Sequence, residues 1–202
     1  MLNVFSSGIL KGLQSLQILT IRKCDALEVI FDLEGRNDKE IDYTATIQLR
    51  ELYVSHLKSL TSVRNKDPKG LLTFQNLWSL KVEDCPRLKY LFPVFVAKTL
   101  VQLEDLWIIS CGMEAIVANE NEDETTPLFL FPQLTTLLLE SLHQLKRFCS
   151  RRFSSKLPLL KKLKVCNCDK AEVLFQEISL EGELDNKIQQ PLFLIKKKVH
   201  IS

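Results

Sequence analysis

Cysteine and histidine are the side chains of this chain that could bind a metal ion or act as nucleophiles, and there are six cysteines and three histidines. No C-x-x-C pair occurs, and the wide, irregular separations of the cysteines match no zinc-finger register. We therefore expect no metal site. Cys149 lies in a basic segment, CSRRF, and we interpret it as an exposed thiol.

The other groups with catalytic potential are also isolated. His56, His143 and His200 are far apart, and none has a serine or cysteine at motif spacing. A catalytic triad can occur in any chain order, so sequence order alone leaves an esterase or protease triad open. In the acidic run ENEDE we expect a solvated loop, where nothing would shift the pKa of a carboxyl group. Overall we expect no catalytic residues and no cofactor, and therefore not an enzyme.

The spacing of the apolar residues points to a fold. In FQNLWSLKVEDCPRL, residues 74–88, the steps between apolar residues are three, three, two, three and three. The two-residue step puts Leu80 and Val82 on the same side of a short strand. The three-residue steps indicate sharp turns before and after that strand. This is the pattern of a leucine-rich repeat.

The same spacing recurs along the whole chain. The first strand position is occupied in turn by Leu19, Leu52, Leu80, Leu106, Leu137 and Leu163. The turn position after each strand is occupied by Cys24, Leu57, Cys85, Cys111, Leu142 and Cys168. A thiol fits there as a small buried group that can hydrogen-bond weakly to the turn backbone. The copy around Cys111 is one residue short after the turn, so its turn must be rebuilt locally.

These repeats predict one elongated α/β domain. We expect a right-handed solenoid with a curved parallel sheet of about six short strands, and loops and short helices on its convex side. A helix is expected near Phe92 to Leu100, where PVFVAKTL has helical spacing. Two acidic insertions, EGRNDKEIDYTAT and NENEDETTPLF, are interpreted as solvated loops.

Both ends of the chain lack a recognisable capping repeat. Val4-Phe5 aligns with Leu91-Phe92, so the chain is expected to begin inside a repeat. PLFLIKKKVHIS resembles PLFLFPQLTTLLL but runs into lysines where a seventh repeat is expected. We assign residues 1–195 to the repeat domain and 196–202 to a basic tail. The pattern favours a segment of a longer array or a shortened gene product.

The repeats also carry a family resemblance. The motifs that carry it are LxxLxxLxLxxC followed by CPRLKYLFP, then LVQLEDLWIISCGMEAIV and FPQLTTLLLESLHQLKRF. Together they resemble the C-terminal leucine-rich repeats of plant coiled-coil nucleotide-binding (NBS-LRR) disease-resistance proteins. The resemblance implies a cytoplasmic solenoid that senses pathogen effectors or the host proteins they modify, and that holds a nucleotide-binding module inactive. The sequence departs from the family in having no GxxxxGK[ST] loop, coiled coil or helical switch module.

The strand residues that alternate with the buried ones should form the concave, protein-binding face. From these we select the charged, histidine and aromatic residues Arg22, Lys23, Tyr53, His56, Lys81, Glu83, Asp105, Trp107, Glu140, Lys162 and Lys164. Tyr53 and Trp107 occupy the same column, two repeats apart, and aromatic residues often anchor interfaces. Alternatively, such exposed aromatics stabilise the sheet by cross-strand packing.

The net charge indicates which class of partner to expect, and the absence of targeting signals indicates the compartment. The net charge is +2 and the concave set mixes both signs, so we expect a protein partner and no nucleic acid. The lysine clusters 161–164 and 196–198 are interpreted as solvated faces or interdomain contacts. We find no signal peptide, membrane span or N-x-[ST] sequon, which favours the cytoplasm, with the nucleus second. The isolated chain is expected to be a monomer without a membrane partner.

Two functional hypotheses remain open. The chain is either the sensing and autoinhibitory segment of an immune receptor, or a stand-alone adaptor or truncated, non-signalling remnant. A weaker third option is the substrate-recognition arm of a ubiquitin ligase, which would need an F-box ahead of the repeats.

Overall fold

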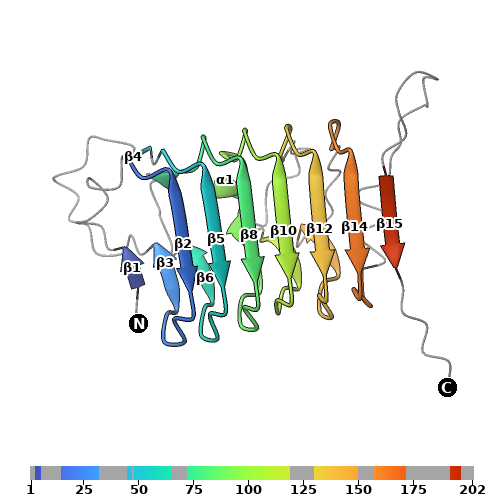
Figure 1. Ribbon diagram of the computed structural model, residues 1–202, viewed down its shortest axis with the longest axis horizontal. Helices are drawn as coiled ribbons and strands as arrows, with labels where there is room; N and C mark the ends of the chain where they lie inside the picture. Colours follow the sequence, from blue (N-terminus) through green and yellow to red (C-terminus); the bar gives the residue numbers. More distant parts are fainter. Residues whose placement is uncertain are drawn as a thin grey trace, which may run out of the picture.

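The main element is a seven-stranded parallel sheet whose strands follow one another in chain order (Figure 1). The computed structural model describes residues 3–5, 15–31, 45–46, 48–64, 72–118, 130–149, 157–171 and 192–196. The strands of the sheet are β2 (Ile18–Arg22), β5 (Glu51–Ser55), β8 (Ser79–Glu83), β10 (Asp105–Ile109), β12 (Thr136–Glu140), β14 (Lys162–Cys166) and β15 (Leu192–Lys196). Each parallel pair belongs to successive repeats, which makes the molecule a solenoid.

The strand register confirms the predicted repeats. The first strand positions pair in sequence, Leu19 with Leu52, and so on through Leu80, Leu106, Leu137 and Leu163. Strand β15 continues this register by pairing Phe193 with Leu163, so Leu192–Lys196 forms the strand of a seventh repeat.

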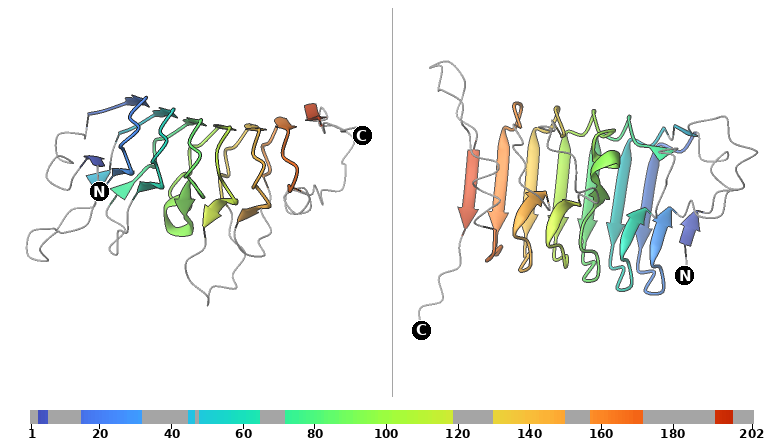
Figure 2. Two further views of the ribbon diagram at one scale, coloured as in Figure 1. Left: turned by 90° about the horizontal axis from the view of Figure 1, so that it is seen from below. Right: turned by 180° about the vertical axis from the view of Figure 1, so that it is seen from behind.

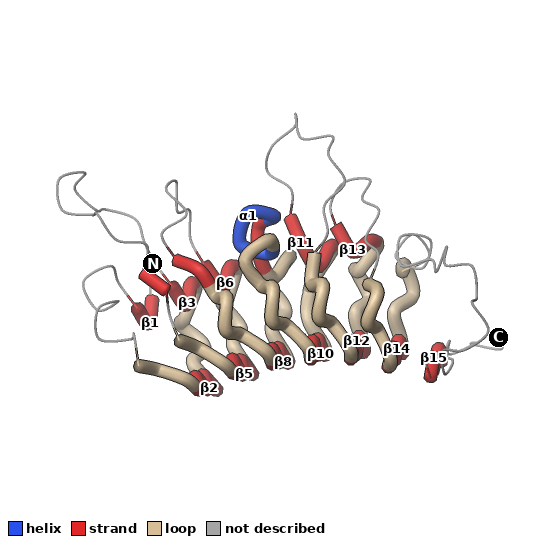
Figure 3. Tube along the Cα trace, turned by 90° about the horizontal axis from the view of Figure 1, so that it is seen from above, coloured by secondary structure: helices blue, strands red, loops and turns tan. Residues whose placement is uncertain are grey.

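The convex side contains short strands that the repeat pattern had not predicted. They form three small parallel sheets, β1 (Asn3–Phe5) with β3 (Val29–Phe31) and β6 (Ser62–Arg64), β9 (Phe92–Pro93) with β11 (Ala115–Ala118) and β13 (Arg147–Cys149), and β4 (Ala45–Thr46) with β7 (Leu72–Thr73). Figures 2 and 3 show most of these strands along the side opposite the gently curved main sheet. The predicted helix is present there as α1 (Val94–Ala97). The pairing of Phe5 with Phe31 supports the predicted alignment of Val4-Phe5 with Leu91-Phe92.

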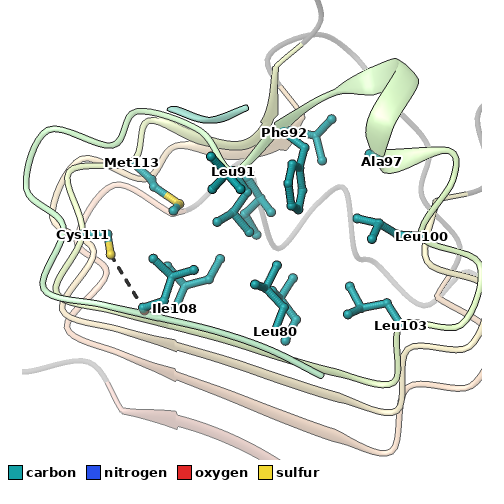
Figure 4. Packing of buried hydrophobic residues seen from close by; sticks show 14 of the residues in the cluster. Leu80, Leu91, Phe92, Ala97, Leu100, Leu103, Ile108, Cys111 and Met113 are labelled. Atoms are coloured by element: carbon teal, nitrogen blue, oxygen red, sulfur yellow. Dashed lines mark hydrogen bonds between the residues drawn. The ribbon is translucent and has the colours of Figure 1, made fainter. Parts of the chain in front are cut away.

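The core lies between the main sheet and the convex side. Within each turn, leucines from before the strand, the strand itself and the segment after the turn converge on one interior (Figure 4). The turn that contains β10 contributes Leu100, Leu103, Leu106, Ile108, Cys111, Met113, Ile116 and Val117, all at most 5% exposed. Because β-strand side chains alternate, each strand gives two residues to this core and leaves the others on the outer face.

The turn cysteines form the predicted backbone hydrogen bonds. In each case the thiol donates to the carbonyl two residues earlier, at 3.2–3.4 Å, as from Cys85 to Glu83 and from Cys111 to Ile109. Cys85 and Cys111 are buried as expected, whereas Cys24 is exposed. Cys149 corrects our interpretation, since it is 2% exposed within β13 and belongs to the core.

The residue after each strand of the main sheet from β2 to β14 adopts a left-handed conformation although none is glycine. These residues are Lys23, His56, Asp84, Ser110, Ser141 and Asn167, with φ between 52° and 57°. This conformation costs an ordinary residue energy. In return, the N–H of Lys23 reaches the carbonyl of Ser55 at 3.0 Å, and four of the other residues make the equivalent bond. The backbone ladder therefore extends one residue past the strand before the chain turns.

The short repeat around Cys111 has the rebuilt turn that its length required. The N–H of Gly112 donates to the carbonyl of Cys85 in the neighbouring repeat at 3.3 Å. A Cβ atom on Gly112 would lie only 1.9 Å from the carbonyl oxygen of Pro86. The two turns therefore stack so closely that only glycine fits.

Gly112→Ala is expected to lower the free energy of unfolding by about 1–3 kcal/mol, because the backbone of Pro86 or of the Cys111 turn must move. Urea denaturation followed by circular dichroism measures this loss. Glu114→Ala, at an exposed position in the same turn, serves as the control and should change stability by less than about 0.5 kcal/mol. Equal stability of both variants would contradict the close approach of the two turns.

One charged residue occupies an inward position on the convex side. Arg64 pairs in register with Phe31 and is 3% exposed, and its guanidinium lies 5.1 Å from the ring centroid of Phe95 on α1. Burial lowers the pKa of Arg64 to about 10. The repeat pattern did not reveal this residue because arginine is an exception to the apolar consensus there.

Candidate protein interface

The structure places all the selected residues on or at the edge of the outer face of the main sheet. This face is the concave one in Figure 3. Nine of the residues lie within strands at outward positions: Arg22, Tyr53, Lys81, Glu83, Asp105, Trp107, Glu140, Lys162 and Lys164. Lys23 and His56 lie just beyond strand ends, in the left-handed turn. All are partly or fully exposed, as the alternation predicted.

A hydrogen-bonded network joins Arg22, Tyr53 and Glu83 across three strands. The Tyr53 hydroxyl donates to Glu83 Oε2 at 2.9 Å and accepts from the Arg22 guanidinium at 3.1 Å. Arg22 Nε also donates to Ser55 Oγ at 3.2 Å, and the guanidinium lies 4.8 Å from the centroid of the Tyr53 ring. The tyrosine is therefore held in one orientation before any partner arrives.

A second contact joins Lys81 and Trp107. The Lys81 ammonium lies 4.2 Å from the centroid of the Trp107 ring, in a cation–π contact. Lys81 is in register between Tyr53 and Trp107, so the two aromatics do not touch as direct neighbours. Each of the two aromatics thus packs against a cation from an adjacent strand, which supports the cross-strand alternative. The indole N–H of Trp107 is buried and has no hydrogen-bond partner among the described residues.

The C-terminal half of the face has a simpler pattern. Lys164 donates to Glu140 Oε2 at 2.8 Å, and this hydrogen bond, together with the attraction between the charges, raises the pKa of Lys164. Lys162 is exposed.

At the ends of β5 and β8, His56 Nε2 lies 3.8 Å from Asp84 Oδ2, which is an ion pair only when the histidine is protonated. Among the described residues, none of these side chains hydrogen-bonds to Arg22, Tyr53 or Glu83.

A hollow of about 400 Å³ opens on this face over strands β2, β5, β8 and β10. Its lining consists of Ile18, Thr20, Glu51, Leu52, Tyr53, Ser79, Lys81, Val82, Glu83, Trp107 and Ile109. The selected set contained four of these residues, Tyr53, Lys81, Glu83 and Trp107, and left out the charged Glu51 together with the apolar and small side chains. Ser79 is the informative omission: a small residue between larger neighbours leaves a depression, and this signal is present in the sequence.

The electrostatics of the turn thiols differ from one repeat to another. A hydrogen bond with Cys85 and burial raise the pKa of Cys111, and burial raises the pKa of Cys168, so these two thiols stay protonated at neutral pH. The same contact with Cys111 lowers the pKa of Cys85. Within the described ranges no group of three or more Cys, His, Asp or Glu residues could hold a metal ion. In the same part of the chain no helix is long and apolar enough to cross a membrane.

Comparisons with known proteins agree with the repeat register and the solenoid. The family model described as "Plant disease resistance protein RPS2-like, leucine-rich repeats" matches residues 1–112, more than half of the chain. A relative in Arabidopsis thaliana, named "Putative disease resistance protein At4g19050", is 30% identical over 99 residues. That match spans 46% of this chain and 8% of the relative. No solved structure matches. The chain therefore belongs to the RPS2-like leucine-rich repeat family of plant disease resistance proteins.

Proposed function

We propose that this chain is the protein-recognition segment of a plant intracellular immune receptor. Its concave face binds a pathogen effector or a host protein that an effector modifies, and it also restrains a nucleotide-binding module. The family match and the solenoid support this proposal. It acts in the cytoplasm as a binding surface, not as an enzyme, and it uses no cofactor.

The arrangement of the concave face carries this proposal. The face presents polar, charged and aromatic side chains from successive strands, and the Arg22–Tyr53–Glu83 network holds part of it rigid. A rigid, preorganised surface loses little conformational entropy when a partner binds. Aromatic residues and arginine at the centre of such a surface are typical of interface hot spots. Its mixed charge suits a protein partner better than nucleic acid.

The test is capture of partners from plant extract by the tagged chain, read by mass spectrometry. The wild-type chain should recover a nucleotide-binding receptor module or a defence-related protein. Tyr53→Ala/Trp107→Ala should reduce that recovery at least about tenfold, because it removes both aromatic side chains from the face. Leu159→Ala, which truncates an apolar side chain that is 42% exposed outside the strands, is the matched control.

Both variants need a check of folding, because Tyr53 and Trp107 also pack against cations of neighbouring strands. Urea denaturation should show that each variant is folded under the capture conditions. Recovery of the same proteins by the wild type and the double variant would contradict binding through this face. Recovery of chaperones alone would contradict recognition altogether.

A further inference from the structure

The hollow on the concave face has rigid walls and a partly apolar lining. Leu52 and Val82 contribute their backbone to its floor, because their side chains point into the core and are at most 1% exposed. The outward side chains of Ile18 and Ile109 are the aliphatic part of the lining. One wall is Tyr53, fixed by Arg22 and Glu83. At about 400 Å³ the hollow lies near the lower end of the roughly 300–1,000 Å³ that small-molecule pockets occupy. It can therefore hold one large side chain.

The cations around the hollow are already engaged with aromatic rings. Lys81 lies over Trp107, and Arg22 lies over Tyr53 while donating to its hydroxyl. An aromatic ring is neutral, so each cation keeps its charge, but the ring holds it in place. Lys81 therefore contributes one positive charge to the hollow. Arg22 and Glu83 share the Tyr53 hydroxyl, so their opposite charges offset each other.

Two carboxylates at the hollow have no such partner. Glu51 lines the hollow, and Asp105 is the corresponding residue two strands away. Asp105 lies beside the lining, and neither carboxylate makes a hydrogen bond or an ion pair with another described residue. Both pair in backbone register with Ser79, one on each side, so their Cα atoms are about two strand spacings, or roughly 10 Å, apart. A single cation above Ser79 could reach both.

Ser79 provides a further polar contact at this point. It lines the hollow, and no hydrogen bond joins its hydroxyl to another described residue. The hydroxyl is therefore open to the hollow and can donate or accept a hydrogen bond with a group that enters it. Because the serine side chain is small, it also leaves the gap between Glu51 and Asp105 open.

We propose that this hollow receives a basic side chain, lysine or arginine, from the partner protein. The aliphatic stem packs against the Tyr53 ring, and the charged head lies over Ser79 between Glu51 and Asp105. The inference rests on the proposed function, because it names the chemistry of the residue that the concave face binds. An acidic side chain would meet two unbalanced carboxylates, and a purely apolar one would leave both without a counter-charge.

The test uses tripeptides in an NMR titration of the whole chain. Acetyl-Gly-Arg-Gly-amide is compared with the same peptide containing citrulline, which has nearly the same shape but no charge. The indole N–H signal of Trp107 reports on the hollow, and that of Trp78, the other tryptophan, provides an internal reference at the strand edge. We expect the arginine peptide to bind about threefold to tenfold more tightly, with the preference decreasing as salt is added.

Three variants test which residues cause the preference for the arginine peptide. Glu51→Gln/Asp105→Asn should abolish the preference for arginine over citrulline, and Ser79→Leu should weaken binding of both peptides by filling the gap. Glu140→Gln removes an exposed carboxylate on the same face outside the hollow and should keep the preference. The amide spectrum of each variant verifies its fold.

Equal affinity for the two peptides, no titration of the Trp107 signal at the highest soluble peptide concentration, or an unchanged preference in Glu51→Gln/Asp105→Asn would overturn the proposal. Its failure is distinguishable from failure of the proposed function. If partner capture still depends on Tyr53 and Trp107 while arginine is not preferred, only the assignment of the hollow is wrong.

Discussion

Phe74→Ala is expected to lower the free energy of unfolding by about 3–5 kcal/mol. Phe74 is completely buried, and its ring centroid lies 5.4 Å from that of Phe31 and 5.7 Å from that of Phe92. The three rings connect segments that are far apart in sequence, so truncation removes contacts on both sides and leaves a cavity between repeats. Chemical denaturation measured by circular dichroism and tryptophan fluorescence would give the loss.

Phe95→Ala is the matched control for this truncation. Phe95 is 39% exposed on α1, and its ring contacts the Arg64 guanidinium. Loss of that contact and of a half-exposed ring should cost less than about 1 kcal/mol. If Phe74→Ala were no more damaging than Phe95→Ala, the aromatic stack would not be part of the folded core.

Leu80→Ala is expected to cost about 2–5 kcal/mol. Leu80 is fully buried in β8, in register between Leu52 and Leu106. A solenoid gains its stability from contacts between neighbouring repeats, so a cavity at this position weakens the interfaces on both sides. Urea denaturation measures the loss.

Lys81→Ala is the control for Leu80→Ala, because it truncates a side chain of the same strand that is not in the core. Lys81 is adjacent in β8 but points to the outer face, where it contacts Trp107. Its truncation should cost less than about 1 kcal/mol. A loss below about 0.5 kcal/mol for Leu80→Ala would show that the repeat register is wrong.

The hydrophobic core and the proposed recognition surface lie on opposite faces of the same strands. The core side is set by Leu80 and its equivalents, and the outer side by residues such as Tyr53 and Lys81. Substitutions on the outer face can therefore change binding while the solenoid stays folded, which makes the proposed binding experiments interpretable.

The repeat register and the parallel sheet can be predicted from the amino-acid sequence. Leu80 and Val82, two residues apart between three-residue steps, can both reach one interior only if the chain runs as a short strand between turns. The same local rule applies to every copy, so the alignment of Leu19 with Leu163 through the intervening strands follows from spacing alone. It also identified which strand residues face outward.

The contacts of those outward residues and the construction of the rest of each turn can be seen only in the folded structure. Spacing within one repeat does not reveal that Cys149 is buried in a convex strand or that Gly112 is packed against Pro86. Nor does it reveal that Tyr53 hydrogen-bonds to Glu83 and that Lys81 makes a cation–π contact with Trp107. The physical reason is the range of the interactions: inward positions follow from the local period, whereas these contacts join residues of different repeats, 30 residues apart for Tyr53 and Glu83.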